Sequence, residues 1–213
     1  MTLSIIQMPM GPLQTNCYVI ACNETKQAAI IDPAWDARAI LRQVDEQGWT
    51  ISHILLTHAH FDHVGALADL KARTDAPVYA HADTVPMLER ATTAAAMWGF
   101  TIEQPLPPDH LLQEGEVVAV GELRPIVLST PGHAPGHVCF YLAEHRVVFD
   151  GDVLFQGGIG RTDLPGGDYA TLMASIRDKL LTMPDETMVL SGHGQPTTIG
   201  EERRGNPFLL EME

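Results

Sequence analysis

Four short apolar runs in this sequence end directly in histidine or aspartate, and this pattern constrains the fold more than any other feature. The runs are Ile54-Leu55-Leu56-Thr57 before His58-Ala59-His60-Phe61-Asp62-His63, Ile126-Val127-Leu128-Ser129-Thr130 before Pro131-Gly132-His133, Val147-Val148-Phe149 before Asp150-Gly151-Asp152, and Met188-Val189-Leu190 before Ser191-Gly192-His193. Such runs are typical of buried strands. Because strand ends meet at the edge of a sheet, we expect the four segments to deliver their polar side chains to one place.

The stretch from His58 to His63 carries four ligand-type side chains in six residues. Alternate residues of an extended chain point the same way, which predicts a shared direction for His58, His60 and Asp62. His63 would stand at a turn into the next helix and face a second position. Neutral imidazole and carboxylate are preferred ligands of zinc and similar ions, whereas a polar loop that caps a helix needs no such density. The candidate metal ligands are therefore His58, His60, Asp62, His63, His133, Asp152 and His193.

The remaining histidines lack this setting, and we expect them at the surface or in packing positions. They are His53, His81, His110, His137 and His145. Asp150 is close to Asp152 in the chain, and we expect it to support a ligand from behind rather than to bind metal itself.

The apolar and turn pattern predicts strands and helices that alternate along the chain. Strands are expected at 3–8, 17–22, 28–31, 53–57, 78–80, 117–120, 124–129, 138–142, 147–149 and 187–190, and helices at 37–47, 63–73, 84–97 and 169–182. Two β-rich halves with interspersed helices indicate two packed sheets covered by helices. No repeat or long linker divides residues 1–213, so we expect one domain.

Composition narrows the partners and the compartment. The formal net charge of -14 disfavours nucleic acid, because an acidic surface repels phosphate. No apolar run approaches the roughly 20 residues that cross a bilayer, and the first residues lack the features of a secretory signal. Cys17, Cys22 and Cys139 are interpreted as reduced packing residues. We therefore expect a cytoplasmic monomer or small homo-oligomer without nucleic-acid or membrane partners.

The metal-binding motifs resemble those of the metallo-β-lactamase superfamily. The stretch Thr57-His58-Ala59-His60-Phe61-Asp62-His63-Val64-Gly65 resembles its Thr-His-x-His-x-Asp-His-x-x-Gly signature, and Pro131-Gly132-His133, Gly151-Asp152 and Gly192-His193 resemble its later metal motifs in the same order. The resemblance implies an α/β (α+β) fold, an αββα sandwich of two mixed sheets with the metal site at one edge. It also implies two divalent ions per chain, with zinc expected first and iron or manganese as alternatives.

The same resemblance divides the candidate ligands between the two ions. One ion is expected on His58, His60 and His133, the other on Asp62, His63 and His193, with Asp152 between them. Asp62 and Asp152 are the expected catalytic carboxylates, because their negative charge offsets part of the charge of the metals and leaves them Lewis acidic.

Within the superfamily, the chain resembles short bacterial hydroxyacylglutathione hydrolases (type II glyoxalases) that lack a helical C-terminal domain. The likeness lies in Asp152-Val153-Leu154-Phe155 and in the glycine-rich stretch that ends at Arg161. It implies that a metal-held hydroxide hydrolyses a small-molecule thioester, S-2-hydroxyacylglutathione of the S-lactoylglutathione type. It also makes Arg161 a candidate for binding a glutathione carboxylate. The alternative for Arg161 is a loop arginine paired with Asp163 or Asp168.

Two departures from the glyoxalase pattern predict weak or relaxed recognition of glutathione. Thr162 and Asp163 stand where typical glyoxalases have aromatic residues. Only twenty residues follow His193 in this sequence, so we expect the basic residues of the usual extra domain to be absent. Arg203 and Arg204 either replace them in part or lie at the end of a solvated helix.

Other functions of the same scaffold remain as alternatives. A persulfide dioxygenase is the main one: Gly160-Arg161-Thr162-Asp163 resembles such enzymes, which would hold one iron on His58, His133 and Asp152. A β-lactamase is disfavoured because those enzymes do not use a bridging aspartate at the position of Asp152. The negative charge disfavours a nuclease, and the complete ligand set disfavours a non-catalytic binding module.

Overall fold

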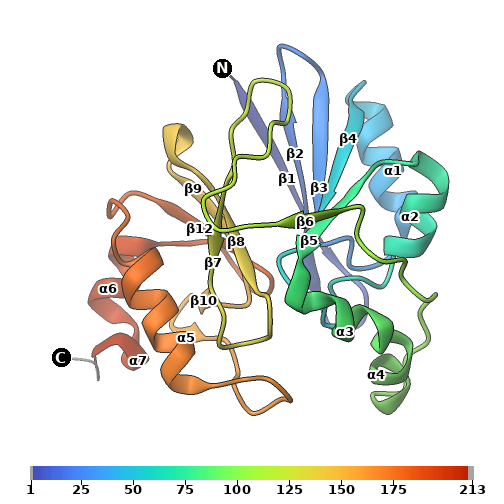
Figure 1. Ribbon diagram of the computed structural model, residues 1–213. Coiled ribbons are helices and arrows are strands. Elements are labelled where there is room, and N and C mark those ends of the chain that lie inside the picture. Colours follow the sequence, from blue (N-terminus) through green and yellow to red (C-terminus); the bar gives the residue numbers. More distant parts are fainter. Residues whose placement is uncertain (1, 211–213) are drawn as a thin grey trace.

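The computed structural model describes residues 2–210, which form two β-sheets packed face to face with helices on both outer faces (Figure 1). Both sheets contain parallel and antiparallel pairs. The predicted αββα sandwich of two mixed sheets is therefore confirmed. Among the described residues, no helix has the length and apolar character needed to cross a membrane.

The first sheet has six strands in the order β1-β2-β3-β4-β5-β6. Their bounds are Leu3–Met10, Thr15–Cys22, Gln27–Ile31, Thr50–Leu55, Val78–His81 and His110–Leu112. Strands β1 to β3 pair antiparallel, and β3 to β6 pair parallel. Parallel neighbours need crossover connections, which contain helices here. These are α1 (Ala37–Glu46), α2 (Leu67–Thr74), α3 (Val85–Glu89) and α4 (Ala91–Met97).

The sequence around α1 shows why that helix begins and ends where it does. The side chain of Asp36 accepts a hydrogen bond from the Ala39 amide at 3.1 Å and so caps the first turn. Gly48, with a φ of +66°, lets the chain turn away after the last helical residues. Between these ends, Ile40 and Val44 form a buried stripe that packs against the first sheet.

The second sheet has five strands in the order β13-β12-β9-β8-β7. The bounds are Ile126–Ser129 for β7, Val138–Leu142 for β8, Val147–Gly151 for β9, Met188–Ser191 for β12 and Thr197–Thr198 for β13, and β10 (Leu154–Phe155) and β11 (Gly158–Ile159) form a separate hairpin. The outer face of the second sheet carries α5 (Tyr169–Ser175), α6 (Ile199–Gly205) and α7 (Pro207–Leu210). Strands β7, β9 and β12 all run in the same direction, so their last residues meet at one edge.

Three buried apolar layers hold the sandwich together. The middle layer lies between the sheets and contains Phe140, Phe149 and Tyr18, the last two in an edge-to-face contact at 5.2 Å between ring centroids. The outer layers lie under the helices, with Leu70 in one and Ile176 in the other. Burial of this apolar surface is the main favourable free energy of folding.

Several predicted elements differ from the observed ones. The helix predicted at 63–73 begins only at Leu67, because the chain from His60 to Ala66 forms successive turns. The helix predicted at 84–97 is divided into α3 and α4 at Arg90, and the one at 169–182 continues from α5 into a π-helical turn, Ile176–Leu180. The strand predicted at 117–120 contributes only isolated bridges.

The middle layer predicts a large loss of stability when its aromatic side chains are truncated. Phe140→Ala should lower the free energy of unfolding by about 3–5 kcal/mol, because it removes a fully buried ring and leaves a cavity. Urea denaturation measures this change. The matched control is Phe208→Ala on α7, whose ring is partly exposed and which should cost under about 1 kcal/mol. Equal losses in both variants would contradict the assignment of Phe140 to the core.

Candidate metal centre

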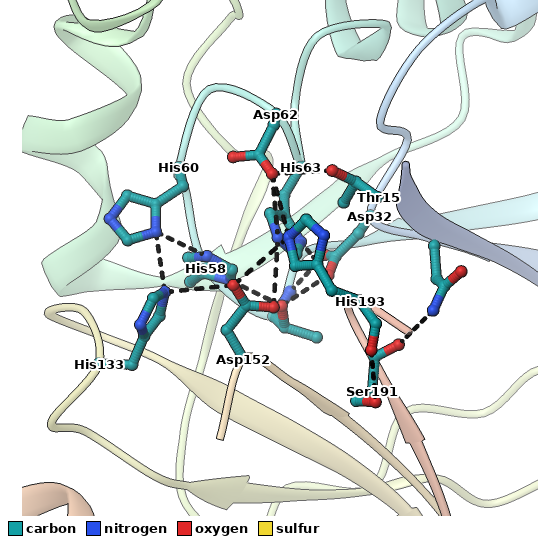
Figure 2. A network of polar contacts seen from close by, with 12 residues as sticks. Thr15, Asp32, His58, His60, Asp62, His63, His133, Asp152, Ser191 and His193 are labelled. Atoms are coloured by element: carbon teal, nitrogen blue, oxygen red, sulfur yellow. Dashed lines mark hydrogen bonds and ion pairs between the residues drawn. The ribbon is translucent and has the colours of Figure 1, made fainter. Parts of the chain in front are cut away.

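The candidate ligands lie together at one edge of the sandwich, as Figure 2 shows. His133, Asp152 and His193 follow β7, β9 and β12 of the second sheet, and His58 to His63 follow β4 of the first sheet. The expectation that residues 58–62 are extended fails from Phe61 onward, because residues 61–63 form a turn, whereas residues 58–60 have no regular secondary structure. The side chains of His60 and Asp62 nevertheless reach the same centre, since the turns bring them there (Figure 2).

Three imidazoles form the first group of candidate ligands. Nδ1 of His60 lies 3.0 Å from Nε2 of His58 and 2.9 Å from Nε2 of His133. The three nitrogens lie within 4.8 Å of one another, a spacing that allows all of them to bind one ion.

A carboxylate and two imidazoles form the second group. Oδ2 of Asp62 lies 3.2 Å from Nε2 of His193 and 3.7 Å from Nε2 of His63. These atoms also fall within 4.8 Å of one another. His63 is fully buried, whereas the His193 side chain keeps 32% of its surface exposed, so the centre is open to solvent on the His193 side.

The carboxylate of Asp152 lies between the two groups. Its Oδ1 is 3.4 Å from Nε2 of His63, and its Oδ2 is 3.5 Å from Nε2 of His133 and 3.6 Å from Nε2 of His193. One carboxylate therefore contacts both groups, the arrangement expected of a ligand shared by two ions.

The ring nitrogens that face the centre are free to bind a cation. Nδ1–H of His63 donates to Asp32 at 3.0 Å and Nδ1–H of His133 donates to the Arg161 carbonyl at 2.8 Å, which leaves Nε2 of each ring facing the centre as the atom that would bind a cation. Thr57 Oγ1 donates to Asp32 and therefore accepts from Nδ1 of His58, with the same result.

The electrostatics of the centre also fit metal ions. Burial lowers the pKa of His60 to about 4 and keeps the imidazole neutral, the form that binds metal. Burial opposes the charged form of His63 too, but the carboxylates of Asp152 and Asp62 raise its pKa. Buried Nε2 of His63 and Oδ1 of Asp152 have no hydrogen-bond partner in the described part of the chain. Positive charge at this place would satisfy both atoms.

Asp32 is a functional residue that the sequence analysis missed. It follows β3 directly, and its Oδ1 accepts from the Thr57 amide at 2.8 Å while its Oδ2 accepts from Thr57 Oγ1 at 2.6 Å and from His63. The signal was present, because Asp32 also follows an apolar run, 28–31. Thr15 supports the centre similarly: its hydroxyl donates to Asp62 Oδ2 at 2.8 Å.

His137 is buried beside the centre and was expected only as a surface or packing residue. Its ring stacks on His58 at 5.0 Å, and its Nε2 accepts a hydrogen bond from the Asp152 amide at 3.2 Å. Its Nδ1–H donates to Thr130 at 2.9 Å. It thus holds the backbone of Asp152. Asp150, expected to support a ligand, accepts instead from the Leu154 amide and fixes the turn that follows.

The other four histidines lie outside the centre, as expected. His53 packs against Tyr79 with ring centroids 4.9 Å apart, and His110 pairs with Glu116 at 2.6 Å. His81 caps the turn after β5, and His145 lies in the turn after β8.

The glycines before two candidate ligands allow close approaches to the centre. A Cβ on Gly192 would overlap Oδ1 of Asp152, and one on Gly132, whose φ is +129°, would overlap the backbone of Leu172 at α5. A larger residue at either position would displace His193 or His133. Steric crowding therefore explains why glycine precedes histidine at these two strand ends.

The basic side chains that the sequence analysis considered for substrate binding are already paired. The guanidinium of Arg161 makes two hydrogen bonds to Asp163, at 2.7 and 2.8 Å, and is about half exposed. Arg203 and Arg204 both pair with Asp185. The Arg161 backbone, in contrast, contacts the centre directly through its carbonyl and His133.

Comparison with known protein families matches this arrangement. The family model described as the metallo-beta-lactamase superfamily matches residues 10–193, a span that includes all seven candidate ligands. The chain belongs to the metallo-beta-lactamase superfamily. It is thereby a metal-dependent enzyme of the hydrolase type, in a superfamily with dinuclear metal sites.

Members of the superfamily with similar sequences cover nearly the whole chain. A probable metallo-hydrolase, YqgX of Bacillus subtilis, is 44% identical over 95% of this chain and 96% of its own length. The hydroxyacylglutathione hydrolase GloC of Haemophilus influenzae is 43% identical over 97% and 98%.

Two solved structures of the superfamily are also similar. The B3 metallo-beta-lactamase BLEG-1 has a TM-score of 0.91 at 45% identity, covering 97% of this chain and 99% of that one. TTHA1623, in a di-iron-bound form, has a TM-score of 0.89 at 46% identity, covering 96% and 100%.

The contacts of Asp32 predict that it strengthens metal binding without touching the ions. Asp32→Asn keeps the shape of the side chain, but an amide group replaces one acceptor oxygen and the negative charge is lost. His63 therefore loses the partner that orients its ring. Metal affinity should fall about 10- to 100-fold, measured by competition with a chromogenic chelator. Asp178→Asn, at an exposed ion pair with Arg177, is the control and should bind metal normally. Unchanged affinity in Asp32→Asn would refute its role.

Proposed function

We propose that this chain hydrolyses S-2-hydroxyacylglutathione thioesters, such as S-lactoylglutathione, with two divalent ions, zinc in the first instance. The observation that carries the proposal is the position of Asp152, whose carboxylate contacts imidazoles of both ligand groups. The 43% sequence identity between this chain and GloC, over almost the full length of both, supports the choice of substrate.

The residues of the centre would position and neutralise the reacting groups. Two ions bound there supply Lewis acidity and an activated water near neutral pH. Asp62 and Asp152 contribute two negative charges, and Thr15 keeps Asp62 in place through its hydroxyl. The substrate would enter on the His193 side, since His58, His63 and His133 are buried, whereas the His193 side chain is 32% exposed.

A thioester suits this centre because its leaving group needs little help. A thiol with a pKa of about 8.5 departs as the thiolate, so no protonated side chain is required to donate a proton. His193 is the solvent-facing imidazole of the group, and Asp62 and Asp152 face it.

A second candidate function is a persulfide dioxygenase with one iron on His58, His133 and Asp152. The observation that favours it is the similar structure of ETHE1 from Myxococcus xanthus, a persulfide dioxygenase, which has a TM-score of 0.82 at 31% identity and covers 98% of this chain and 85% of that one. The two functions differ in their need for the second ligand group.

His193→Ala separates the two functions. It damages the second ligand group, but it leaves intact the three residues that would hold a single iron, His58, His133 and Asp152. If the chain is a dinuclear hydrolase, the variant should lose one metal equivalent per chain, and its rate of S-lactoylglutathione hydrolysis should fall more than about a hundredfold. This loss is larger than the loss expected when a residue that only hydrogen-bonds a metal ligand is removed. Elemental analysis and release of thiol measure the two effects.

The same preparations should be tested for oxygen uptake with glutathione persulfide and for hydrolysis of a β-lactam. We expect neither activity. Oxygen uptake that survives His193→Ala, with one iron per chain, would replace the proposal by the dioxygenase. Efficient β-lactam cleavage without thioesterase activity would assign the site to a different substrate.

Arg161 remains our proposed contact for a glutathione carboxylate, which requires its guanidinium to leave Asp163. Arg161→Ala should lower kcat/KM for S-lactoylglutathione about tenfold, mainly through KM, and Arg161→Lys should restore only part. The wild-type protein and Arg161→Ala should hydrolyse a thioester without the glutathione carboxylates with the same kcat/KM. If Arg161→Ala is equally slow on both substrates, the residue supports the loop beside His133 instead.

A further inference from the structure

His193 lacks the orienting hydrogen bond that His63 and His133 have. Nδ1 of each of those two rings donates to an acceptor behind it, whereas the polar contacts of the His193 side chain within residues 2–210 all use Nε2. A metal-binding imidazole needs a fixed orientation, and a partner for its other nitrogen is the usual way to fix it. In His193 the ring must be oriented by packing instead.

Phe155 supplies that packing. Its ring lies edge to face against the imidazole of His193, with centroids 6.4 Å apart and ring planes at 74°. The other ring that contacts His193 in the described part of the chain is His63, at 5.4 Å, which belongs to the same ligand group. The half-buried Phe155 is thus the aromatic contact of His193 that comes from outside the ligand set. A fixed ring in this position limits the rotation of the imidazole.

Phe155 belongs to the β10–β11 hairpin, whose base is joined to the centre. The hairpin begins two residues after Asp152, and the Gly160 amide closes it by donating to the Val153 carbonyl at 3.1 Å. A Cβ on Gly160 would overlap the carbonyl oxygen of Asp152, so the base is tightly packed. The strands have only two residues each. A hairpin this short is not stable by itself, and its tip needs support from elsewhere.

Two buried polar side chains near the end of the chain hold the tip of the hairpin. Glu202 on α6 is 3% exposed, and Asn206, directly after α6, is fully buried. Oε2 of Glu202 accepts from the Gly157 amide and from Nδ2 of Asn206, both at 2.8 Å, and Oε1 accepts from Thr197 Oγ1 at 2.6 Å. Nδ2 of Asn206 also donates to the Gly158 carbonyl at 2.9 Å. A buried carboxylate requires such partners, so the pair and the hairpin tip fix each other.

We propose that Glu202 and Asn206 are positioning residues for the second ligand group. They fix the tip of the β10–β11 hairpin, the hairpin fixes Phe155, and Phe155 fixes the ring of His193. The effect is selective for one ion. The first ligand group keeps its support, because the Arg161 carbonyl, which binds His133, lies beyond the closed base of the hairpin. The proposal goes beyond the thioesterase function and is independent of the substrate.

The first test measures zinc binding to Phe155 variants by competition with a chromogenic chelator. Phe155→Ala should bind the second zinc about tenfold more weakly and the first zinc normally, and Phe155→Tyr, which keeps the ring, should restore most of the loss. Phe208→Ala, which removes a partly exposed ring from α7, is the matched control and should bind both ions normally. An unchanged second affinity in Phe155→Ala would overturn the proposal, and so would a wild-type protein that binds one zinc per chain.

The second test asks whether Phe155 acts through His193. In His193→Ala, which retains the first ligand group, the further change Phe155→Ala should not alter the affinity for the remaining zinc. A further loss as large as that in the wild-type background would mean that Phe155 supports the fold in general, which contradicts the proposal. Zinc binding is measured without substrate, so a protein without thioesterase activity would reject the proposed function and leave this result unaffected.

The third test addresses the buried pair. Glu202→Ala should weaken the second zinc about as much as Phe155→Ala. Glu202→Gln should not, because its oxygen can accept from Gly157 and Asn206 while the Thr197 hydroxyl accepts from its amide and donates to Glu201, 3.2 Å away. Glu201→Ala, on the same helix but exposed, is the control and should bind both ions normally.

Asn206→Ala carries the same expectation as Glu202→Ala and leaves Glu202 its hydrogen bonds to Gly157 and Thr197. It is the variant to use where Glu202→Ala does not fold, as judged by circular dichroism. Folded variants of the pair that bind the second zinc normally, or that bind both ions equally weakly, would overturn the positioning role.

Discussion

The arrangement of side chains at this edge of the sandwich depends on the contacts between the Asp152 carboxylate and the surrounding imidazoles. The carboxylate lies within 3.6 Å of imidazole nitrogens from three separate segments of the chain. A buried charge of this kind is tolerated only when it is paired, so the three imidazoles must be held in fixed orientations. Asp32, itself held by Thr57, orients His63 from behind, and the Arg161 carbonyl orients His133. His137 fixes the other end, the amide of Asp152 itself.

The candidate site was predictable where its residues directly follow apolar strands. The ends of strands such as β9 and β12 gather at one edge whatever the detailed pairing, so His193 and Asp152 could be placed together from the sequence. Asp32 has the same position after β3, but an aspartate before Pro33 is equally typical of a turn. The role of His137 depends on how the β7–β8 connection places its ring behind Asp152, a tertiary contact that no local pattern encodes.

Helix boundaries and exposed side chains were less predictable for physical reasons. The turns from His60 to Ala66 are shaped by the contacts of the centre, which delay the start of α2 to Leu67. The division between α3 and α4 at Arg90 has no Pro or Gly at the break to announce it. Arg161 lies on an exposed loop, where its choice of Asp163 as a partner is decided by side-chain reach rather than by secondary structure.

Each ligand group draws on both sheets. His58 and His60 come from the first sheet and His133 from the second, while Asp62 and His63 come from the first and His193 from the second. Bound ions would therefore act as two staples across the sandwich, in addition to the apolar layer between the sheets. Sliding of one sheet over the other would then have to stretch both staples at once. Loss of the ions would loosen the sheets against shear at this edge first, and the entrance to the site would widen before the distant core responds.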